Sequence, residues 1–196
     1  MREPAAGRAD EIIDVVCEIL DTEGYEAATV RTVARRARVS LTTMYKLFGT
    51  VDELILRAVE HWMQTNAYDA LTMPEVGEDP YETMVRVLRT MFKPWEEHPR
   101  MLDAYHRAQN RPGGERLVIH GMAVVKPIVG ASLPTVDAAY LEDLEVIHQL
   151  VVRAAIAQFA NGEIAVTEIL PILERALFRL TTDNSVMFER IRGAVR

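Results

Sequence analysis

The sequence has little of three features that mark other classes of protein: cysteine, long uncharged runs and an N-terminal leader. Cys17 is the only cysteine, so no disulfide can form within the chain, which is typical of a reducing compartment. The most apolar stretch, 117–133, is interrupted by His120, Lys126 and Pro127 and falls short of the roughly 18 uncharged residues of a membrane span. No basic and apolar leader with a small-residue cleavage site is seen. We therefore expect a cytoplasmic protein with no membrane partner.

Sequence patterns of catalysis and metal binding are also missing. The chain has no glycine-rich phosphate loop, and its three serines, Ser40, Ser132 and Ser185, do not lie in the turn of an activated nucleophile. None of the five histidines falls in a HExxH or paired-cysteine setting that favours zinc. The sequence thus predicts no cofactor, no metal site and no catalytic centre.

Helical periodicity is nearly continuous along the chain, whereas strand signals are sparse, which predicts an all-α fold. In residues 9–23, for example, Ile12, Val16 and Ile19 share one face, while Glu18 lies on the opposite one. We expect helices at 9–23, 30–37, 41–48, 51–71, 80–97, 100–110, 115–130, 136–161 and 165–181.

Two breaks divide these helices into a smaller and a larger domain. The dipeptide "GT" ends the first group of helices at residue 50, and "TMPEVGEDP" (72–80) is typical of a linker. We therefore predict a three-helix domain at 1–50, a connecting helix at 51–71 and a larger helical domain at 72–196.

Charge is unevenly distributed along this acidic chain, whose formal net charge is −7. Residues 1–26 carry 2 basic and 8 acidic side chains, residues 27–50 carry 5 and 0, and residues 51–196 carry 15 and 21. Because acidic surface repels nucleic acid, any phosphate contact is expected within 27–50. The alternative is a solvated helix face, which is the usual meaning of a charge run.

Two short helices in this basic window are predicted to form a helix-turn-helix. Thr29 and Ser40 stand where N-caps are expected, before residues 30–37 and before the helix that begins at Leu41. Helical spacing separates the polar side chains from the apolar ones. The polar, outward positions are Arg31, Arg35, Arg38, Thr42, Thr43 and Lys46.

The stretch "TVRTVARRARVSLTTMYKLFGTVDEL" (Thr29 to Leu54) resembles the DNA-binding domain of TetR/AcrR-family transcriptional regulators. The likeness covers about residues 9–60, and the cap, the arginine-bearing helix, the "VS" turn, the "TxYxxF" helix and the acidic start of the next helix occur in order. The resemblance implies a homodimer that places two recognition helices in successive major grooves of a palindrome-like operator. It also implies release when a small molecule occupies the larger domain, so we expect a ligand-responsive repressor of double-stranded operator DNA.

Carried over position by position, the resemblance implies a set of DNA contacts. Arg31, Thr43 and Tyr45 match positions that usually touch the DNA backbone, and the start of the second short helix lies where bases are read. The full predicted DNA-binding set is Thr29, Arg31, Arg35, Arg38, Ser40, Leu41, Thr42, Thr43, Tyr45 and Lys46. Bases are expected to be read by Leu41, Thr42 and Lys46.

The chain departs from the family pattern at three positions in or near this predicted DNA-binding set. Members usually have glycine where Arg38 and Thr42 stand, and lysine where this chain has Val51. The last difference removes a customary phosphate partner at the start of the connecting helix.

A second set of residues is predicted to line an apolar ligand cavity. Methionine and aromatic side chains occur at helical spacing across the helices after residue 80, and such side chains suit either a packed core or a cavity. In the cavity interpretation, Tyr105 and His106 orient a polar end of the ligand. The predicted ligand-binding residues are Met84, Met91, Phe92, Trp95, Tyr105, His106, Met122 and His148. The stretch "HPRMLDAYHRAQ" and the C-terminal helices also resemble the steroid-catabolism repressor branch, which implies a hydrophobic effector, steroid or acyl-CoA-like.

The last two predicted helices suggest a dimer. Residues 136–161 are apolar over most of the helix circumference and must be covered on two sides, and residues 165–181 are amphipathic. A single-chain core and an isologous four-helix interface both fit this pattern. We expect the interface, because no other segment is left to cover both faces. Its predicted residues are Leu144, Val151, Ala155, Phe159, Ile169, Leu173 and Leu177.

Two other functions fit the composition. One is an all-α small-molecule-binding protein or enzyme without a DNA role, and the other is a helical module whose arginines bind acidic protein. Salt-dependent binding to a DNA duplex separates the first prediction from both.

Overall fold

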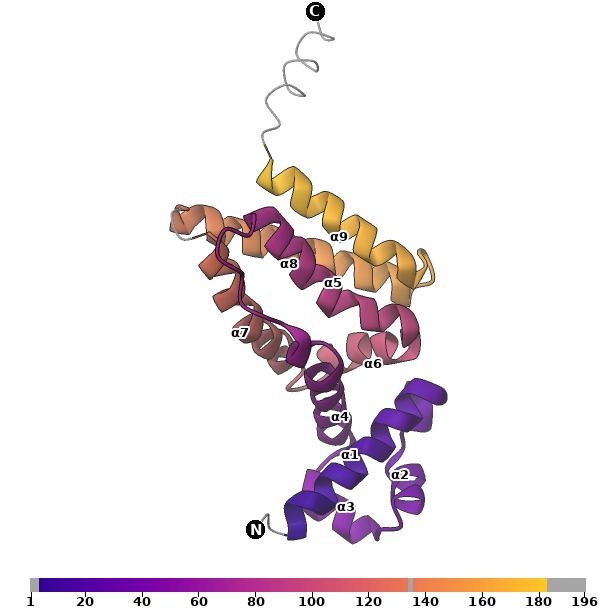
Figure 1. The fold of residues 1–196 in the computed structure, drawn as a ribbon. Helices are drawn as coiled ribbons and strands as arrows, with labels where there is room; N and C mark the ends of the chain where they lie inside the picture. Colours follow the sequence, from indigo (N-terminus) through magenta and orange to yellow (C-terminus); the bar gives the residue numbers. More distant parts are fainter. Residues whose placement is uncertain (1–3, 134–135, 183–196) are drawn as a thin grey trace, which may run out of the picture. The chain divides into compact units, whose positions relative to one another are not determined.

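The computed structural model describes residues 4–133 and 136–182, and the regular structure within these ranges is helical (Figure 1). In chain order the elements are α1 (Pro4–Thr22), a 3₁₀ turn (Tyr25–Ala27), α2 (Val30–Arg36), α3 (Leu41–Phe48), α4 (Val51–Asn66), a second 3₁₀ turn (Tyr68–Ala70), α5 (Pro80–Glu97), α6 (Pro99–Gln109), α7 (Glu115–Ser132), α8 (Ala138–Ala160) and α9 (Val166–Thr181). The predicted all-α fold, with a helix-turn-helix before further helices, is confirmed.

The N-terminal helix is longer than predicted, because it starts at Pro4 rather than at residue 9. Arg8 lies within the added turn and forms an ion pair with Glu11 at 2.6 Å. Its guanidinium also donates a hydrogen bond to the carbonyl oxygen of Ala37 at 3.1 Å. The added turn is therefore held both locally and by the end of α2.

The connecting helix α4 is shorter than predicted and ends at Asn66 rather than at residue 71. Ala67 leaves the helical conformation, with φ −126° and ψ −56°, and the following 3₁₀ turn buries the ring of Tyr68. The hydrophobic pattern continues through this turn, which is why periodicity alone overestimates the length of the helix.

Three helices contain a proline and continue past it. Pro94, Pro127 and Pro171 lie inside α5, α7 and α9. Each proline removes one backbone hydrogen bond of its helix. The helix continues in each case, which agrees with the rule that tertiary packing supplies most helical stability.

The chain contacts separate two compact units. Unit 1 consists of the described residues of 1–73 and 90–128, and unit 2 of those of 74–89 and 129–196. The limits at residues 50 and 72 were predicted for a DNA-binding domain and a ligand-binding domain, and this division by function stays a prediction. Within the described ranges, no helix combines the length and the apolar character that crossing a membrane requires.

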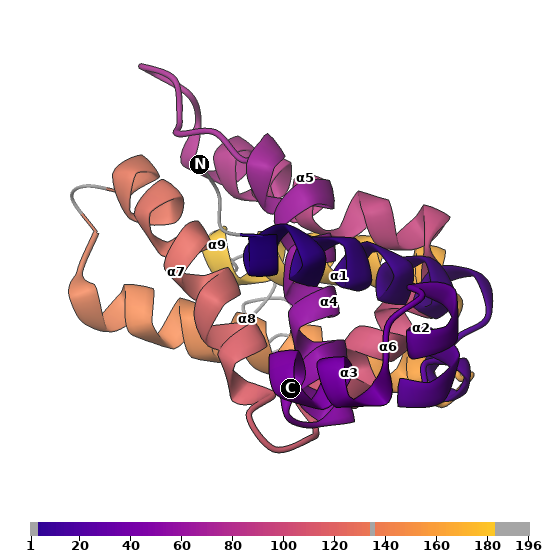
Figure 2. The same cartoon turned by 90° about the horizontal axis from the view of Figure 1, so that it is seen from below.

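Unit 1 is built around one face of α1. Ile12, Val16, Ile19 and Leu20 recur at helical spacing and are fully buried where α1 packs on α2, α4 and α6. Figure 2 shows α2 and α3 beside α1 and α4. Burial of such a side chain stabilises the fold by about 1.5–3 kcal/mol. The apolar faces of the two short helices are turned inward by the same packing, which leaves their polar faces on the surface.

The helix that follows the helix-turn-helix is braced from several sides. Arg116 of α7 donates to Glu53 of α4 at 2.7 Å and to Glu60 of α4 at 3.1 Å. Trp62 of α4 packs on Trp95 of α5, with ring centroids 4.5 Å apart. The start of α4, directly after α3, is thus tied to elements that lie far along the chain.

Unit 2 is dominated by the pairing of α8 with α9. Both helices turn a buried apolar stripe toward the contact, and its members are Leu144, Ala155, Ile156, Ile169, Leu173 and Leu177. The first half of α5 joins the pair through an ion pair between Arg89 and Glu174 at 2.7 Å. The rings of Tyr81 and Phe178 add an edge contact at 5.9 Å.

Candidate nucleic-acid interface

Side-chain caps fix the starts of the two short helices. The Thr29 hydroxyl accepts a hydrogen bond from the Thr32 amide at 3.2 Å, and the Ser40 hydroxyl accepts one from the Thr43 amide at 3.0 Å. Both predicted N-caps are therefore present, and each contributes about 1 kcal/mol. A third cap, not predicted from the sequence, starts α4, where the Thr50 hydroxyl accepts a hydrogen bond from the Glu53 amide at 3.1 Å.

The turn between α2 and α3 closes with a left-handed residue. Arg38 has φ +53°, and the Val39 amide donates to the Ala34 carbonyl at 3.0 Å, as in a Schellman motif. Arg38 is the only non-glycine residue with positive φ in the described ranges. Glycine favours this conformation because it has no Cβ, which explains the glycine that family members usually have at this position. This chain instead carries a long cationic side chain there.

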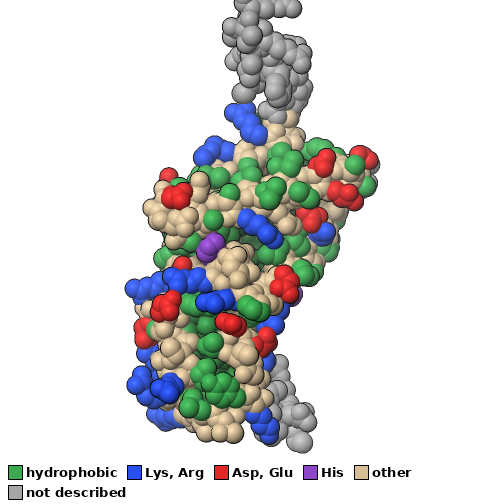
Figure 3. Space-filling view, turned by 180° about the vertical axis from the view of Figure 1, so that it is seen from behind, with side chains coloured by type: hydrophobic (Ala, Val, Ile, Leu, Met, Phe, Trp, Pro, Cys, Tyr) green, Lys and Arg blue, Asp and Glu red, His purple; other side chains and the backbone are tan. Residues whose placement is uncertain are grey.

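The predicted DNA-contacting residues share the outer surface of α2 and α3. Leu41 and Tyr45 are 43% and 56% exposed, although most side chains of their size lie in the core. Arg31, Arg35 and the remaining predicted side chains are also exposed, except for Thr43, which is half-buried. Figure 3 shows several Lys and Arg side chains around the N-terminal helices at the bottom of that view. The predicted set is thus exposed on α2, α3 and the turn between them, apart from Thr43.

The basic side chains of this surface differ in whether the chain already neutralises them. Arg36 forms an ion pair with Glu23. Within the described ranges Arg31, Arg35, Arg38 and Lys46 form no ion pair with a carboxylate. A phosphate can therefore approach these four cations without breaking an internal ion pair. We call these four side chains the unpaired cations.

The surface offers the two kinds of group that recognise a duplex. Arginine and lysine attract phosphates, while hydroxyl groups such as that of Tyr45 add local hydrogen bonds to the backbone. Lys46 and Thr42 are exposed on α3. The major groove of DNA is wide enough to admit an α-helix, and base edges are distinguishable there. Together they can fix the position of a helix on DNA and read part of its sequence.

Sequence reasoning missed two interactions that shape this surface. The ion pair between Arg36 and Glu23 and the hydrogen bond from Arg8 to Ala37 join residues from different helices. No periodic signal in the sequence marks either pair, because both depend on how α1 packs against α2.

Replacing Arg38 with glycine is expected to stabilise the fold and weaken DNA binding at the same time. Left-handed backbone destabilises an L-residue by about 1–2 kcal/mol, part of which the greater freedom of glycine in the unfolded chain offsets. We expect the free energy of unfolding to rise by about 0.5–1 kcal/mol in urea titrations. Operator affinity is expected to fall about three- to tenfold as one phosphate contact is lost from each copy.

Two further variants at the same position separate charge from conformation. Arg38→Asn tolerates the left-handed backbone but lacks the charge, so it should bind DNA as weakly as the glycine variant. Arg38→Lys keeps the charge and should retain most of the affinity. Unchanged operator affinity in Arg38→Gly would show that this guanidinium does not touch DNA.

The predicted ligand-binding residues are divided between the two units. Met91, Phe92, Trp95, Tyr105, His106 and Met122 belong to unit 1, and Met84 and His148 belong to unit 2. Trp95 is buried between Trp62 and Tyr105, at centroid distances of 4.5 and 5.6 Å. The core interpretation left open by the sequence therefore applies to Trp95, and a role of the other residues in ligand binding stays a prediction.

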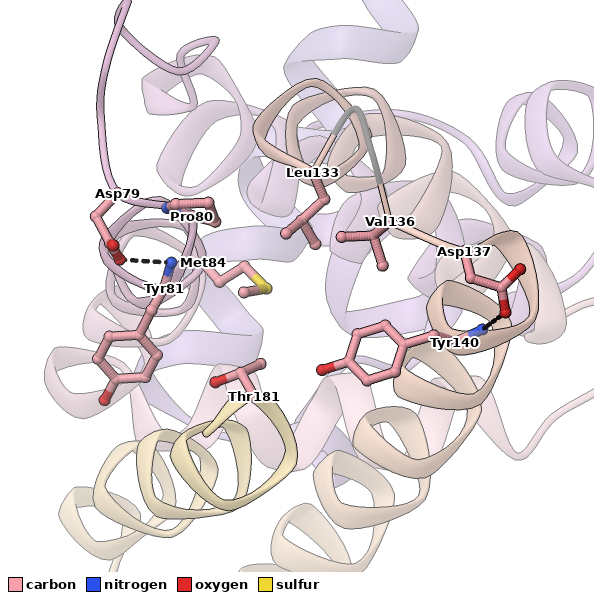
Figure 4. Close-up of a pocket in the computed structure, with 9 residues that line it drawn as sticks. All are labelled: Asp79, Pro80, Tyr81, Met84, Leu133, Val136, Asp137, Tyr140 and Thr181. Atoms are coloured by element: carbon pink, nitrogen blue, oxygen red, sulfur yellow. Dashed lines mark hydrogen bonds between the residues drawn. The ribbon is translucent and has the colours of Figure 1, made fainter. Parts of the chain in front are cut away.

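An open cavity of about 590 Å³ lies within unit 2 (Figure 4). Met84 is the one predicted ligand residue among those that line it. The lining residues are Asp79, Pro80, Tyr81, Met84, Leu133, Val136, Asp137, Tyr140 and Thr181. They come from the start of α5, the ends of α7 and α9, and the start of α8. The sequence analysis missed most of them because they meet only when these four helix ends come together.

His148 lies on α8, and its Nε2 atom is buried with no hydrogen-bond partner in the described ranges. Burial lowers the pKa of His148, and a hydrogen bond with the backbone of Leu173 opposes this in part. The unfolded chain therefore takes up the proton first as the pH falls below the ordinary histidine pKa of about 6.5. The charged imidazolium is the form that the folded state disfavours.

We expect this histidine to make the folded state less stable in mild acid. The melting temperature should fall between pH 7.5 and pH 5.5, and a His148→Leu variant should lose less over the same interval. The difference between the two proteins is the quantity to measure, because it isolates the contribution of His148. Identical pH dependence of the two melting temperatures would contradict the assignment.

The residues predicted to form a dimer interface lie mostly inside the single chain. Leu144, Ala155, Ile169, Leu173 and Leu177 are buried, and Val151 and Phe159 are half-buried. They form the contact of α8 with α9 or lie beside it, so they do not offer an exposed face. Val146, Ile147 and Leu150 of α8 are instead exposed, on one side of the helix. We call these three residues the outer stripe of α8, and the place of the dimer interface stays a prediction.

Within the described ranges, no group of three or more His, Cys, Asp or Glu side chains is placed to hold a metal ion. Cys17 lies half-buried in unit 1 and its thiol donates to the Ala58 carbonyl at 3.3 Å. Burial raises the pKa of this thiol to about 12. The thiol therefore has a structural contact and little thiolate character at neutral pH.

Comparison with known proteins gives two family matches and one curated relative. The family described as "Bacterial regulatory proteins, tetR family" matches residues 12–58, and "Tetracyclin repressor-like, C-terminal domain" matches residues 77–180. The HTH-type transcriptional repressor KstR of Rhodococcus jostii (strain RHA1) is 28% identical over 101 residues, which are 52% of this chain and 47% of the relative. The chain thus matches about half the length of that relative.

Solved structures with the same architecture cover nearly the whole chain. A TetR transcriptional regulator from Rhodococcus sp. RHA1 has a TM-score of 0.72 at 14% identity and covers 93% of this chain and 99% of its own. A TetR-like transcriptional regulator from the same organism has a TM-score of 0.60 at 19% identity and covers 91% and 97%. At such identities these structures show the shared fold. Together with the two family matches, which join the helix-turn-helix to the C-terminal helices, they show that the chain belongs to the TetR family of transcriptional regulators, which are DNA-binding proteins and not enzymes.

Proposed function

We propose that this regulator is a homodimeric repressor that holds operator DNA with α2 and α3 and releases it when a hydrophobic molecule binds. The observation that carries the proposal is the set of unpaired cations. Arg31, Arg35, Arg38 and Lys46 are exposed in a segment without acidic residues, in a chain that is otherwise acidic. Such a distribution concentrates the attraction for phosphate on one small surface.

The division of labour on DNA follows from the position of each group. Arg31 and Arg35 of α2, with Thr43 and Tyr45 of α3, are proposed to contact phosphates. Leu41, Thr42 and Lys46 are proposed to face base edges in the major groove, with Leu41 offering an apolar contact to a thymine methyl group. The caps Thr29 and Ser40 hold the helices in place and add hydroxyl oxygens near the backbone.

The second copy is proposed to cover the outer stripe of α8. Val146, Ile147 and Leu150 expose apolar surface along one side of a helix whose opposite side is already buried on α9. A two-fold arrangement brings the same stripe of both copies together and forms a four-helix interface. Two helix-turn-helix surfaces then meet DNA at half-sites about 34–36 Å apart, one turn of the duplex.

Release is proposed to be a shift between two populations of the dimer. A ligand that binds better to the conformer with the wrong half-site spacing lowers the fraction able to hold the operator. The resemblance noted from the sequence favours a hydrophobic effector, steroid or acyl-CoA-like.

The proposal is tested by fluorescence anisotropy with duplexes from the DNA that flanks the gene of this protein. Binding should weaken steeply between 50 and 300 mM salt, with a log–log slope of about −5 to −7 for up to eight cations per dimer. A duplex of the same length and composition but scrambled order should bind more weakly. Absent binding, or binding that salt does not change, contradicts the proposal.

A further inference from the structure

The cavity of unit 2 has apolar walls. Met84, Leu133 and Val136 line its centre, and Figure 4 shows their side chains turned toward the open space. Its volume of about 590 Å³ lies within the range of 300–1,000 Å³ that is usual for small-molecule sites. The walls therefore suit the apolar body of a small molecule.

Two hydroxyl groups that line this space already donate hydrogen bonds to backbone carbonyl groups. The Tyr140 hydroxyl donates to the Leu180 carbonyl at 2.9 Å, and the Thr181 hydroxyl donates to the Leu177 carbonyl at 2.9 Å. Figure 4 shows the Tyr140 oxygen directed toward the open space, with Thr181 at its edge, whereas the hydroxyl of Tyr81 points away from it. Since a hydroxyl has one proton and two lone pairs, Tyr140 and Thr181 present acceptors to a ligand.

The charged groups at the rim are acidic. Asp79 accepts hydrogen bonds from the amides of Tyr81 and Glu82 at 2.9 and 3.2 Å, and Asp137 accepts one from the amide of Tyr140 at 3.4 Å. These carboxylates cap the starts of α5 and α8. None of the nine lining residues is Lys, Arg or His. The charged side chains among the nine are thus both acidic, and each accepts from backbone amides at a helix start.

We propose that this cavity binds an apolar small molecule whose polar end is a hydrogen-bond donor, with an ammonium group preferred, and that it rejects carboxylates and phosphates. An ammonium has three donors and a positive charge, which suit a lining with hydroxyl acceptors, two acidic side chains and no cation. A carboxylate needs donors that the lining side chains do not supply, and it is repelled by the rim. The same chemistry disfavours the phosphates of an acyl-CoA in this cavity and admits a hydroxyl-bearing apolar body.

The proposal is tested with three probes that share one ten-carbon tail: decylamine, decan-1-ol and decanoate. Binding to the full-length protein is measured by isothermal titration calorimetry, at concentrations below those at which the probes aggregate. At pH 7 the amine is cationic and the acid anionic. We expect decylamine to bind most tightly, decan-1-ol next and decanoate at least about tenfold more weakly than the amine. Equal or tighter binding of decanoate overturns the proposal.

Two sets of variants place the binding in this cavity. Asp79→Asn and Asp137→Asn remove charge but keep the caps, because asparagine caps helices as well as aspartate does. Each should lower the preference for amine over acid about fivefold. Glu142→Gln with Glu163→Gln removes the same two charges from exposed positions outside the lining, and should leave the preference unchanged.

Variants that fill the cavity are the second test of where the probes bind. Met84→Trp and, as an independent variant, Val136→Phe should each abolish binding of all three probes while the helical circular dichroism stays native. Undiminished amine binding in a folded filled variant overturns the proposal.

The assignment of this cavity as the effector site rests on the proposed function, whereas probe binding does not. Addition of decylamine to the protein–operator complex should release the duplex, and the filled variants should resist release. If decylamine binds the cavity and the operator complex persists, the binding preference of the cavity is supported and its role as the effector site is refuted. If the protein binds no operator but binds the amine, the proposed DNA function fails and the cavity is still supported.

Discussion

Neutralising Arg31, Arg35 and Lys46 together is expected to lower operator affinity by about a hundredfold or more at physiological salt. Three of the four unpaired cations are lost from each copy, so a dimer loses six charges that face phosphate. The log–log salt slope should become shallower by about 5, because each neutralised phosphate contributes about 0.9. Anisotropy titrations at several salt concentrations measure both quantities. Replacement by glutamine is suitable because it keeps a long side chain with good helix propensity.

A matched triple variant shows whether position or net charge matters. The control removes three positive charges, as the first triple variant does, by the substitutions Arg36→Gln, Arg100→Gln and Arg111→Gln. Arg36 is already paired with Glu23, and Arg100 and Arg111 are exposed on or just after α6. This control should stay within about threefold of the original affinity. Unchanged affinity in the first triple variant, or equal losses in both, would remove the basis of the proposed interface.

Placing glutamate at Ile147 and Leu150 is expected to give a monomer that binds operator at least about a hundredfold more weakly. A two-fold interface brings four new carboxylates together in place of apolar surface, which opposes association. Loss of the dimer also removes the gain that two linked half-site contacts provide, about 10² or more. Sedimentation or light scattering gives the oligomeric state, and anisotropy gives the affinity.

The control for this variant is another exposed apolar residue. Val76 lies in the loop before α5 and is fully exposed, so Val76→Glu should leave both the dimer and operator binding unchanged. The glutamates at Ile147 and Leu150 should leave helix content intact, because both side chains are exposed in the single chain. A dimer that persists in the double variant would place the interface on another surface.

Arg38 shows how the helix-turn-helix of this chain differs from the family pattern. Its left-handed backbone is a position at which glycine fits without strain, and its guanidinium is one of the unpaired cations. The Arg8 guanidinium donates to the neighbouring Ala37 carbonyl and helps to hold the turn. We infer that an added cation beside the recognition helix compensates for part of the phosphate attraction that is missing at Val51.

Patterns within a few residues of the chain were sufficient to predict the helix-turn-helix. The caps Thr29 and Ser40, the inward Met44 and the outward Arg31 and Lys46 are all set within a few residues of chain. Helical spacing fixes which side chains share a face, and a cap fixes where the face begins. Both signals act over one or two turns, so they can be read without the rest of the protein.

Interactions between distant helices could not be read in this way. Periodicity showed that α8 is apolar on two sides, but it did not show that Leu144 faces α9 while Leu150 stays exposed. The cavity of unit 2 was largely missed because its lining comes from four helix ends. Tyr140 and Thr181, for example, face one space only because α8 pairs with α9.

The amino-acid sequence by itself determined the all-α class, the two short capped helices and the outward basic face of α2 and α3, because each depends on residues close together in the chain. The tertiary structure alone decided that Arg36 is neutralised by Glu23 while its neighbours are not, which stripe of α8 stays exposed, and where a cavity opens. Those features depend on which distant surfaces meet when apolar faces are buried, and many pairings satisfy the same local pattern.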